Sequence, residues 1–161
     1  MLRTLIFTEE DWTLAIIRVV LGSVFFAHGA GKMLGWFGGS GFHGTMQFFT
    51  QEMGIPAVFA FLAICAEFFG SLGLITGFLS RVASGGIISI MVFAVLLSEG
   101  RNGFFMNWAG DKKGEGYEYH LLAIALSLAV LIKGAGACSF DLAISERLRA
   151  PKIASTSGTI R

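Results

Sequence analysis

The stretch Trp12–Met33, WTLAIIRVVLGSVFFAHGAGKM, decides the fold class of this chain. It is apolar over about the 20 residues that a helix needs to cross the hydrocarbon layer of a bilayer. Three further segments share this character: Pro56–Leu79, Arg81–Ser98 and Tyr117–Ala137. They lack sustained period-two alternation and are rich in Gly and Ala, which favours helices that pack closely in lipid. The sequence therefore predicts an all-α, integral membrane, four-helix antiparallel bundle.

The composition supports a membrane protein. The 161 residues are 54% hydrophobic and only 14% charged, with a mean hydropathy of +0.70. Soluble domains carry about 25% charged residues, which they need to cover their surface. We expect one domain over residues 1–150, in contact with the lipid bilayer, and a flexible C-terminal tail over residues 151–161.

Charge and cysteine content exclude several classes of function. The net charge of +1 gives no basic excess for a nucleic-acid partner. The two cysteines show neither CxxC nor zinc-finger spacing, and no GxGxxG, CxxCH or cysteine cluster indicates a nucleotide, haem or iron–sulfur site. Cys65 lies within the second segment and Cys138 follows the end of the fourth. We expect them to be too far apart for a disulfide, which needs Cα atoms within ~7 Å.

The orientation follows from basic residues that flank the segments, because these accumulate on the cytoplasmic side. One side holds Arg3, Arg81, Lys133, Arg147, Arg149 and Lys152; the other holds Lys32, Arg101, Lys112 and Lys113. Both termini are therefore predicted to be cytoplasmic. A cleaved signal peptide is the alternative for the first segment, but that segment follows Glu9, Glu10 and Asp11 in place of a basic region.

Charged side chains within the segments are the candidate functional residues, because burying a charge in lipid costs about 2.5–3.5 kcal/mol on insertion scales. In the first segment a single helical face carries Arg18, Gly22, Phe25, Gly29 and Lys32, and His28 adjoins it. Glu67 stands near the middle of the second segment, on a face that Ala63, Gly70, Leu74 and Gly77 continue. We expect Glu67 to face the interior, within reach of Arg18, His28 or Lys32.

An antiparallel run of helices places the remaining charges in two groups. His28, Lys32, Glu99, Glu118 and His120 would form a polar pocket in the outer half, with Glu67 beneath them. Toward the cytoplasmic half, an ion pair between Arg18 and Asp141 is expected. The alternative for charges near helix ends is that they extend to the membrane surface. A metal site formed by His28, His120, Glu67 and Glu118 is chemically allowed, but no helix carries two of these ligands at the spacing of HExxH, and we predict none.

Two connections differ in character. The Gly35–Gly54 connection combines several phenylalanines and Trp36 with glycines, which suits a loop lying at the membrane interface over the pocket. The Gly100–Gly116 connection is polar enough for water, and Trp108 would mark the membrane surface.

A family resemblance follows from these motifs together. The first segment carries Arg18-(x)3-Gly22-(x)5-His28-Gly29-(x)2-Lys32, and the second carries Glu67-(x)2-Gly70-(x)2-Gly73 followed by Thr76-Gly77-(x)3-Arg81. Gly116-(x)-Glu118 opens the fourth segment and Gly134-(x)-Gly136-(x)2-Ser139-(x)-Asp141 closes it. In order and spacing, the chain resembles the DoxX family of small bacterial membrane proteins over nearly its whole length.

The resemblance implies a multi-pass protein of the bacterial inner membrane with a link to quinone or sulfur redox chemistry. It would assign Arg18, His28, Lys32, Glu67 and Glu118 to a polar centre. Our leading hypothesis is an oxidoreductase component that acts on a quinone or small sulfur species: Glu67, His28 and Lys32 are the candidate catalytic residues, and Arg18, Glu118 and His120 the candidate substrate-binding residues. A separate redox or catalytic subunit is expected, since the chain has no built-in redox group. The alternative is a non-enzymatic membrane partner, scaffold or small-solute carrier.

Overall fold

The computed structural model describes residues 5–149, and within that range it is all-helical, without a strand. The α-helices are α2 (Trp12–Leu34), α3 (Gly41–Gln47), α4 (Ala57–Thr76), α5 (Ser80–Leu97), α6 (Glu118–Lys133) and α7 (Phe140–Arg149). Short helical turns occur at η1 (Trp36–Gly38), η2 (Phe48–Glu52) and η3 (Glu99–Asn102).

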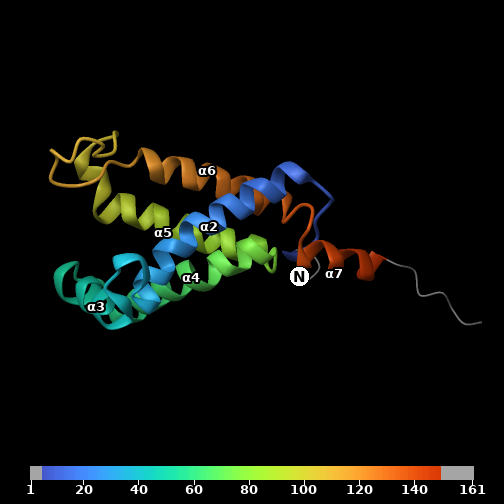
Figure 1. Ribbon diagram of the computed structural model, residues 1–161, viewed down its shortest axis with the longest axis horizontal. Coiled ribbons are helices and arrows are strands. Elements are labelled where there is room, and N and C mark those ends of the chain that lie inside the picture. The colour runs from blue at the N-terminus through green and yellow to red at the C-terminus, as the bar shows by residue number, and fades with distance from the viewer. Residues whose placement is uncertain (1–4, 150–161) are drawn as a thin grey trace, which may run out of the picture.

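The long helices lie along one another (Figure 1). Helix α2 packs on α4, α4 on α5, α5 on α6, and α6 returns to α2. At one end lie α3 and the connection from α5 to α6; we call this the loop end. At the other lie the N-terminal segment, the α4–α5 turn and α7, and we call this the terminal end.

Three described helices are long and apolar enough to cross a membrane: α2 with 23 residues, α4 with 20 and α5 with 18. Helix α6 has 16 residues, which extend about 24 Å at 1.5 Å per residue, less than the ~30 Å of a hydrocarbon core. The predicted fourth segment, Tyr117–Ala137, is longer than the helix because Gly134, at φ 99°, ends it.

Large apolar side chains cover the outside of these helices. Ile16 on α2 is 64% exposed, Phe59 on α4 63% and Phe93 on α5 60%. Such a continuous apolar surface is unstable in water and suits lipid. The interior is filled by Leu21, Phe25, Leu74, Ala83, Ile87, Met91, Ala123 and Val130. The chain is a membrane protein.

Helix α2 has conventional signals at both ends. The Asp11 carboxylate accepts hydrogen bonds from the backbone N–H groups of Thr13 at 2.8 Å and Leu14 at 3.1 Å, which would otherwise lack partners at a helix start. Gly35 ends the helix at φ 76°, a conformation that glycine adopts without a steric penalty. The predicted start of the first segment and its predicted polar face both agree with this helix.

Two glycines allow α2 and α4 to pack closely. A Cβ atom on Gly22 would lie 2.9 Å from the Ile75 side chain, and one on Gly29 would lie 2.8 Å from the Phe68 Cα atom. No side chain fits at either position without moving a backbone. The two helices therefore meet along the face of α2 that carries Arg18 and Lys32.

Arg18 joins three segments at the terminal end. It is 1% exposed, and its guanidinium donates hydrogen bonds to the backbone carbonyl oxygens of Leu74, Ile75, Ala135, Ala137 and Cys138 at 2.5–3.0 Å. These carbonyls lie at the C-terminal end of α4 and in the connection between α6 and α7, where helix geometry leaves oxygens without partners. The five donors of the side chain are thereby occupied.

The predicted ion pair between Arg18 and Asp141 is wrong: within residues 5–149 neither forms a salt bridge. Asp141 caps α5 instead, because its carboxylate accepts from the backbone N–H groups of Leu79 and Ser80, both at 2.9 Å. Both residues stabilise the terminal end by binding backbone groups. Such groups occur at every residue, so the pattern of charged side chains in the sequence does not reveal these partners.

Several local expectations differ from the structure. The interfacial loop predicted between Gly35 and Gly54 contains α3 and the turn η2. Helix α7 follows the fourth segment where no helix was predicted. The buried face of α4 consists of Ala60, Ile64, Glu67, Ser71 and Leu74, and Gly70 packs against α5 instead.

Cys65 and Cys138 are both free thiols. The predicted tail, residues 151–161, lies outside the described residues.

Candidate functional site

Glu67 and Lys32 form an ion pair between α4 and α2. The Lys32 ammonium donates to the Glu67 carboxylate, and this is the only salt bridge within residues 5–149. Glu67 is 3% exposed, whereas the side chain of Lys32 is 32% exposed. The predicted interior placement of Glu67, and its contact with one of the basic residues of α2, are confirmed.

The geometry of α2 explains why these two groups meet. Gly29 brings the α2 backbone against residues 67 and 68 of α4. Lys32 follows Gly29 by about one turn, and side chains on a helix tilt toward its N-terminus. The Lys32 side chain therefore extends back along α2 to the level of Glu67, and it stays partly accessible.

Tyr119 and His28 complete the surroundings of this pair. The ring of His28 lies 6.3 Å from that of Tyr119, and the Tyr119 hydroxyl is buried with no hydrogen-bond partner among the described residues. The Glu67 carboxylate lies near enough to act electrostatically on this hydroxyl. Tyr119 of α6 thus lies near the Lys32–Glu67 pair, and His28, which is exposed on α2, lies beside the Tyr119 ring.

No pattern in the sequence singled out Tyr119. It stands at the start of the fourth segment, where tyrosine commonly marks the membrane surface. Its ring instead packs against the apolar interior, 6.3 Å from the ring of Phe25. The only available signal was helical spacing, because Tyr119 is four residues from Ala123, which faces the interior.

His120 lies next to this group and faces a different side of α6. It is 9% exposed, its ring is 5.6 Å from that of Tyr119, and its Nδ1 atom is buried without a partner in the described part of the chain. The structure therefore places His120 beside Tyr119 and near Glu99 of the turn after α5, and it shows no contact of His120 with the Lys32–Glu67 pair.

Glu118 organises the connection between α5 and α6. Its carboxylate accepts from the backbone N–H of Met106 and from the indole Nε1–H of Trp108, both at 3.0 Å. Trp108 is 86% exposed. Glu99 similarly accepts from Ser98 and Asn102 within the adjoining turn. Both carboxylates are engaged in holding this connection, not in the group around Glu67.

The six predicted site residues thus separate into three groups. Glu67 and Lys32 form a pair near Tyr119, and the rings of His28 and His120 each lie beside the Tyr119 ring. Glu118 lies in the connection at the loop end. Arg18 lies at the terminal end, with its donors bound to carbonyls, and the structure does not bring it to Glu67.

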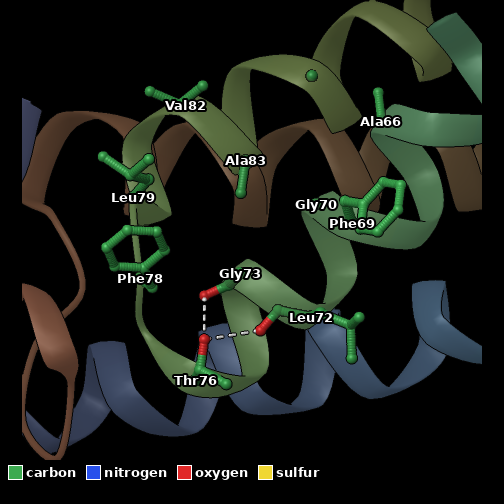
Figure 2. Close-up of a pocket in the computed structure, with 11 residues that line it drawn as sticks. Ala66, Phe69, Gly70, Leu72, Gly73, Thr76, Phe78, Leu79, Val82 and Ala83 are labelled. Atoms are coloured by element: carbon green, nitrogen blue, oxygen red, sulfur yellow. Dashed lines mark hydrogen bonds between the residues drawn. The ribbon is translucent and has the colours of Figure 1, made fainter.

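An apolar groove lies elsewhere, on the outer surface between α4 and α5. It has a volume of about 550 Å³ and is lined by apolar and small residues, among them Phe69, Gly73 and Val82 (Figure 2). Its hydroxyl group, on Thr76, is bound to the carbonyls of Leu72 and Gly73. No candidate catalytic residue lines it, and its chemistry is that of a surface for hydrocarbon.

No arrangement of three or more His, Cys, Asp or Glu side chains suited to hold a metal ion occurs in the part of the chain that the structure describes. A quinone head group would need hydrogen-bond donors at its carbonyl oxygens. Lys32, His28 and the unpartnered Tyr119 hydroxyl are donors of that kind, so the residues present fit such a group.

Comparison with known proteins identifies a matching family and two similar proteins. The family model named DoxX matches residues 13–100, more than half of the chain. The "Inner membrane protein YqjF" of Escherichia coli (strain K12) is 26% identical over 138 residues, which cover 86% of this chain and 96% of that protein. The "Putative oxidoreductase CatD" of Bacillus subtilis (strain 168) is 26% identical over 115 residues, covering 71% and 75%. No solved structure gives a significant match.

Proposed function

The chain belongs to the DoxX family, and from this premise we propose that it is a membrane oxidoreductase component that binds a quinone or small sulfur species at the Lys32–Glu67 pair. The observation that carries the proposal is this pair between α2 and α4, in which Glu67 is buried. The Tyr119 hydroxyl, which has no hydrogen-bond partner within residues 5–149, lies near it, and His28 lies beside the Tyr119 ring. The name of the Bacillus subtilis relative points to the same class of reaction.

The chemistry of these groups suits the reduction of a quinone. Quinone reduction adds two electrons and two protons, and negative charge develops on the carbonyl oxygens as the electrons arrive. Lys32 would stabilise that charge, since an ammonium in a partly buried site interacts strongly with an oxyanion. Glu67 and His28 would transfer the protons. His120 would contribute to substrate binding from the neighbouring side of α6.

The electrons must come from elsewhere, because the sequence carries no haem, nucleotide or iron–sulfur motif. We propose that a separate redox subunit or a reduced sulfur compound supplies them. The quinone is then a diffusing substrate that reaches the site from the bilayer, and the protein provides orientation, protons and electrostatic stabilisation.

The membrane arrangement that we propose is a four-helix antiparallel bundle in which α6 is the fourth span. The 16 residues of α6 cross the bilayer if the membrane thins locally or if flanking residues contribute. Both termini are then cytoplasmic, and the Lys32–Glu67 pair lies on the outer side of Arg18. The bacterial inner membrane fits the name of the Escherichia coli relative.

A non-enzymatic scaffold or carrier is the second candidate. The observation in its favour is that Arg18, Glu118 and Asp141 are all occupied by bonds that hold the fold. If Lys32 and Glu67 serve the same purpose, the interior charges stabilise helix packing and carry out no reaction.

The deciding experiment is to purify the protein in detergent, extract it, and identify copurifying small molecules by mass spectrometry. A bound quinone, lost in Glu67→Gln and retained in Glu52→Gln, supports the oxidoreductase. Glu52 is the matched control because it is exposed on the short turn η2. A protein that carries no quinone and shows no quinone-dependent redox activity would favour the scaffold or carrier.

A further inference from the structure

The hydrogen bonding of serine and threonine hydroxyl groups in this molecule differs according to the side of the helix that they occupy. On outward faces, Ser23, Thr76 and Ser89 each donate to the carbonyl four residues earlier, at 2.8–2.9 Å. This is the usual way in which a helical hydroxyl finds a partner in lipid. Ser80, Ser84 and Ser127 are 0% exposed, yet none of the three has a hydrogen-bond partner among the described residues.

Ser84 and Ser127 are buried residues of α5 and α6, two helices that pack on each other, and they stand at the same level of this contact. The guanidinium of Arg81, at the start of α5, donates to the carbonyls of Leu131 and Ile132 near the end of α6. The two helices run in opposite directions. Ser84 follows Arg81 by three residues on α5, so it stands at the level of α6 residues about one turn before Leu131, which is the level of Ser127.

Ser71 of α4 occupies the same level. Its neighbour Gly70 lies against Ala83 and Ile87 of α5, the turn that carries Ser84. Ser71 is 0% exposed and donates to the Phe68 carbonyl at 2.7 Å, which leaves its oxygen free to accept. Three helices thus contribute a buried hydroxyl to one layer, which we call the serine layer: Ser71, Ser84 and Ser127.

The serine layer lies between Glu67 and the terminal end. Glu67 precedes Ser71 by four residues on the buried face of α4, and Ser80 precedes Ser84 by four residues on the buried face of α5. Residues at this spacing have Cβ atoms about 5–6 Å apart, and the structure shows no hydrogen bond from Glu67 to Ser71 or from Ser80 to Ser84 within the described residues. One water could bridge each of these two gaps. Beyond Ser80 lies Asp141, which binds the Ser80 backbone N–H.

We propose that the serine layer binds internal water, and that this water carries protons between Glu67 and the terminal end of the protein. Buried hydroxyls without partners are costly, and ordered water is the usual partner when no protein group is available. Each water or hydroxyl accepts one proton and releases one, so the path transfers a proton without net chemical change. Only the use of these protons at Glu67 rests on the proposed function.

Thermal unfolding in detergent tests the water directly. If Ser84 and Ser127 share bound water, Ser84→Ala and Ser127→Ala should each lower the Tm, and the double variant should lower it by less than the sum, because the water is lost with the first hydroxyl. Ser89→Ala is the control: this hydroxyl is on the outward face of α5, and its effect should add to that of Ser127→Ala. If the hydroxyls are dry and without a partner, each alanine substitution should raise the Tm instead, because removing such a hydroxyl is stabilising. A raised or unchanged Tm in either single variant, or additive losses, would overturn the water site.

Proton uptake tests the path. In proteoliposomes that contain a quinone and a reduced sulfur compound as the electron donor, a pH-sensitive dye should report proton uptake about tenfold slower in Ser71→Ala, the effect of a barrier higher by about 1.4 kcal/mol. Copurified quinone should stay at the wild-type level. Uptake at the wild-type rate would overturn the path. If the wild-type protein binds no quinone, the proposed function fails, and the unfolding experiment still decides whether the serine layer holds water.

Discussion

Lys32 of α2 and Glu67 of α4 form a salt bridge in which the Glu67 side chain is almost wholly buried and the Lys32 side chain is about one-third exposed. This asymmetry assigns different roles to the two residues. Glu67 is shielded from the surroundings, whereas part of the Lys32 side chain is accessible. Under the proposed function, Lys32 is the member of the pair that would contact a bound anion.

Substitution of Glu67 should separate its structural role from its chemical role. Glu67→Gln keeps size and hydrogen bonding, so the fold should persist while quinone retention is lost. Glu67→Leu leaves Lys32 without a partner and should destabilise the protein by about 1–3 kcal/mol, less than for a fully buried pair because Lys32 is partly exposed. Detergent unfolding and mass analysis of bound ligand measure the two effects.

A double variant provides the check on that interpretation. Lys32→Met combined with Glu67→Leu removes both charges and should recover most of the stability that Glu67→Leu loses, because apolar replacements of an ion pair are often neutral. If the double variant is as unstable as the sum of the single variants, the two residues are not energetically coupled.

Arg18 should prove structural. Lysine has three donors in place of five and lacks the planar geometry that reaches carbonyls from separate segments. Arg18→Lys should therefore lower the free energy of unfolding by about 2–4 kcal/mol, the effect of losing two or more charge-assisted bonds. Arg147→Lys, on the exposed face of α7, is the control and should change little. Wild-type stability in Arg18→Lys would contradict the importance of the carbonyl contacts.

The close contact between α2 and α4 predicts opposite effects for two glycine substitutions. Gly29→Ala places a methyl group against the Phe68 backbone and should destabilise by about 1–3 kcal/mol. Gly85→Ala on α5 meets no atom within 4 Å and should be neutral or stabilising by up to about 1 kcal/mol, the difference in helix propensity. Unfolding of both variants in the same detergent compares them; equal effects would contradict the helix contact.

Reporter fusions test the topology that we propose. A fusion at the C-terminus should report a cytoplasmic location, and a cysteine introduced at Lys112 should react with an impermeant reagent from outside the cell. Lys112 lies in the exposed connection at the loop end. Labelling at position 112 from the cytoplasmic side alone would reverse the orientation and move the Lys32–Glu67 pair to the inner side.

The extent of the candidate site could be predicted only in part. Glu67 and Lys32 stand out in the sequence because a charge within an apolar membrane segment has a high free-energy cost. The helical period of α2 also places Lys32 on the face that packs against the neighbouring helix. Tyr119 could not be found in this way, because a tyrosine near a segment end suits the membrane surface equally well. Glu118 was selected for its charge, and nothing local revealed that a carboxylate there binds the Met106 and Trp108 N–H groups.

What the sequence by itself determined is the membrane class of the protein, its long apolar helices with most of their ends, and the face of α2 that is buried. These properties depend on hydropathy, helical period and capping residues, which are local. Only the tertiary structure decided the partners: Arg18 with five carbonyls instead of Asp141, Asp141 with the start of α5, and Lys32 with Glu67. Backbone carbonyls and N–H groups are present at every residue, so which of them lacks a helical partner near a given side chain depends on how the helices pack.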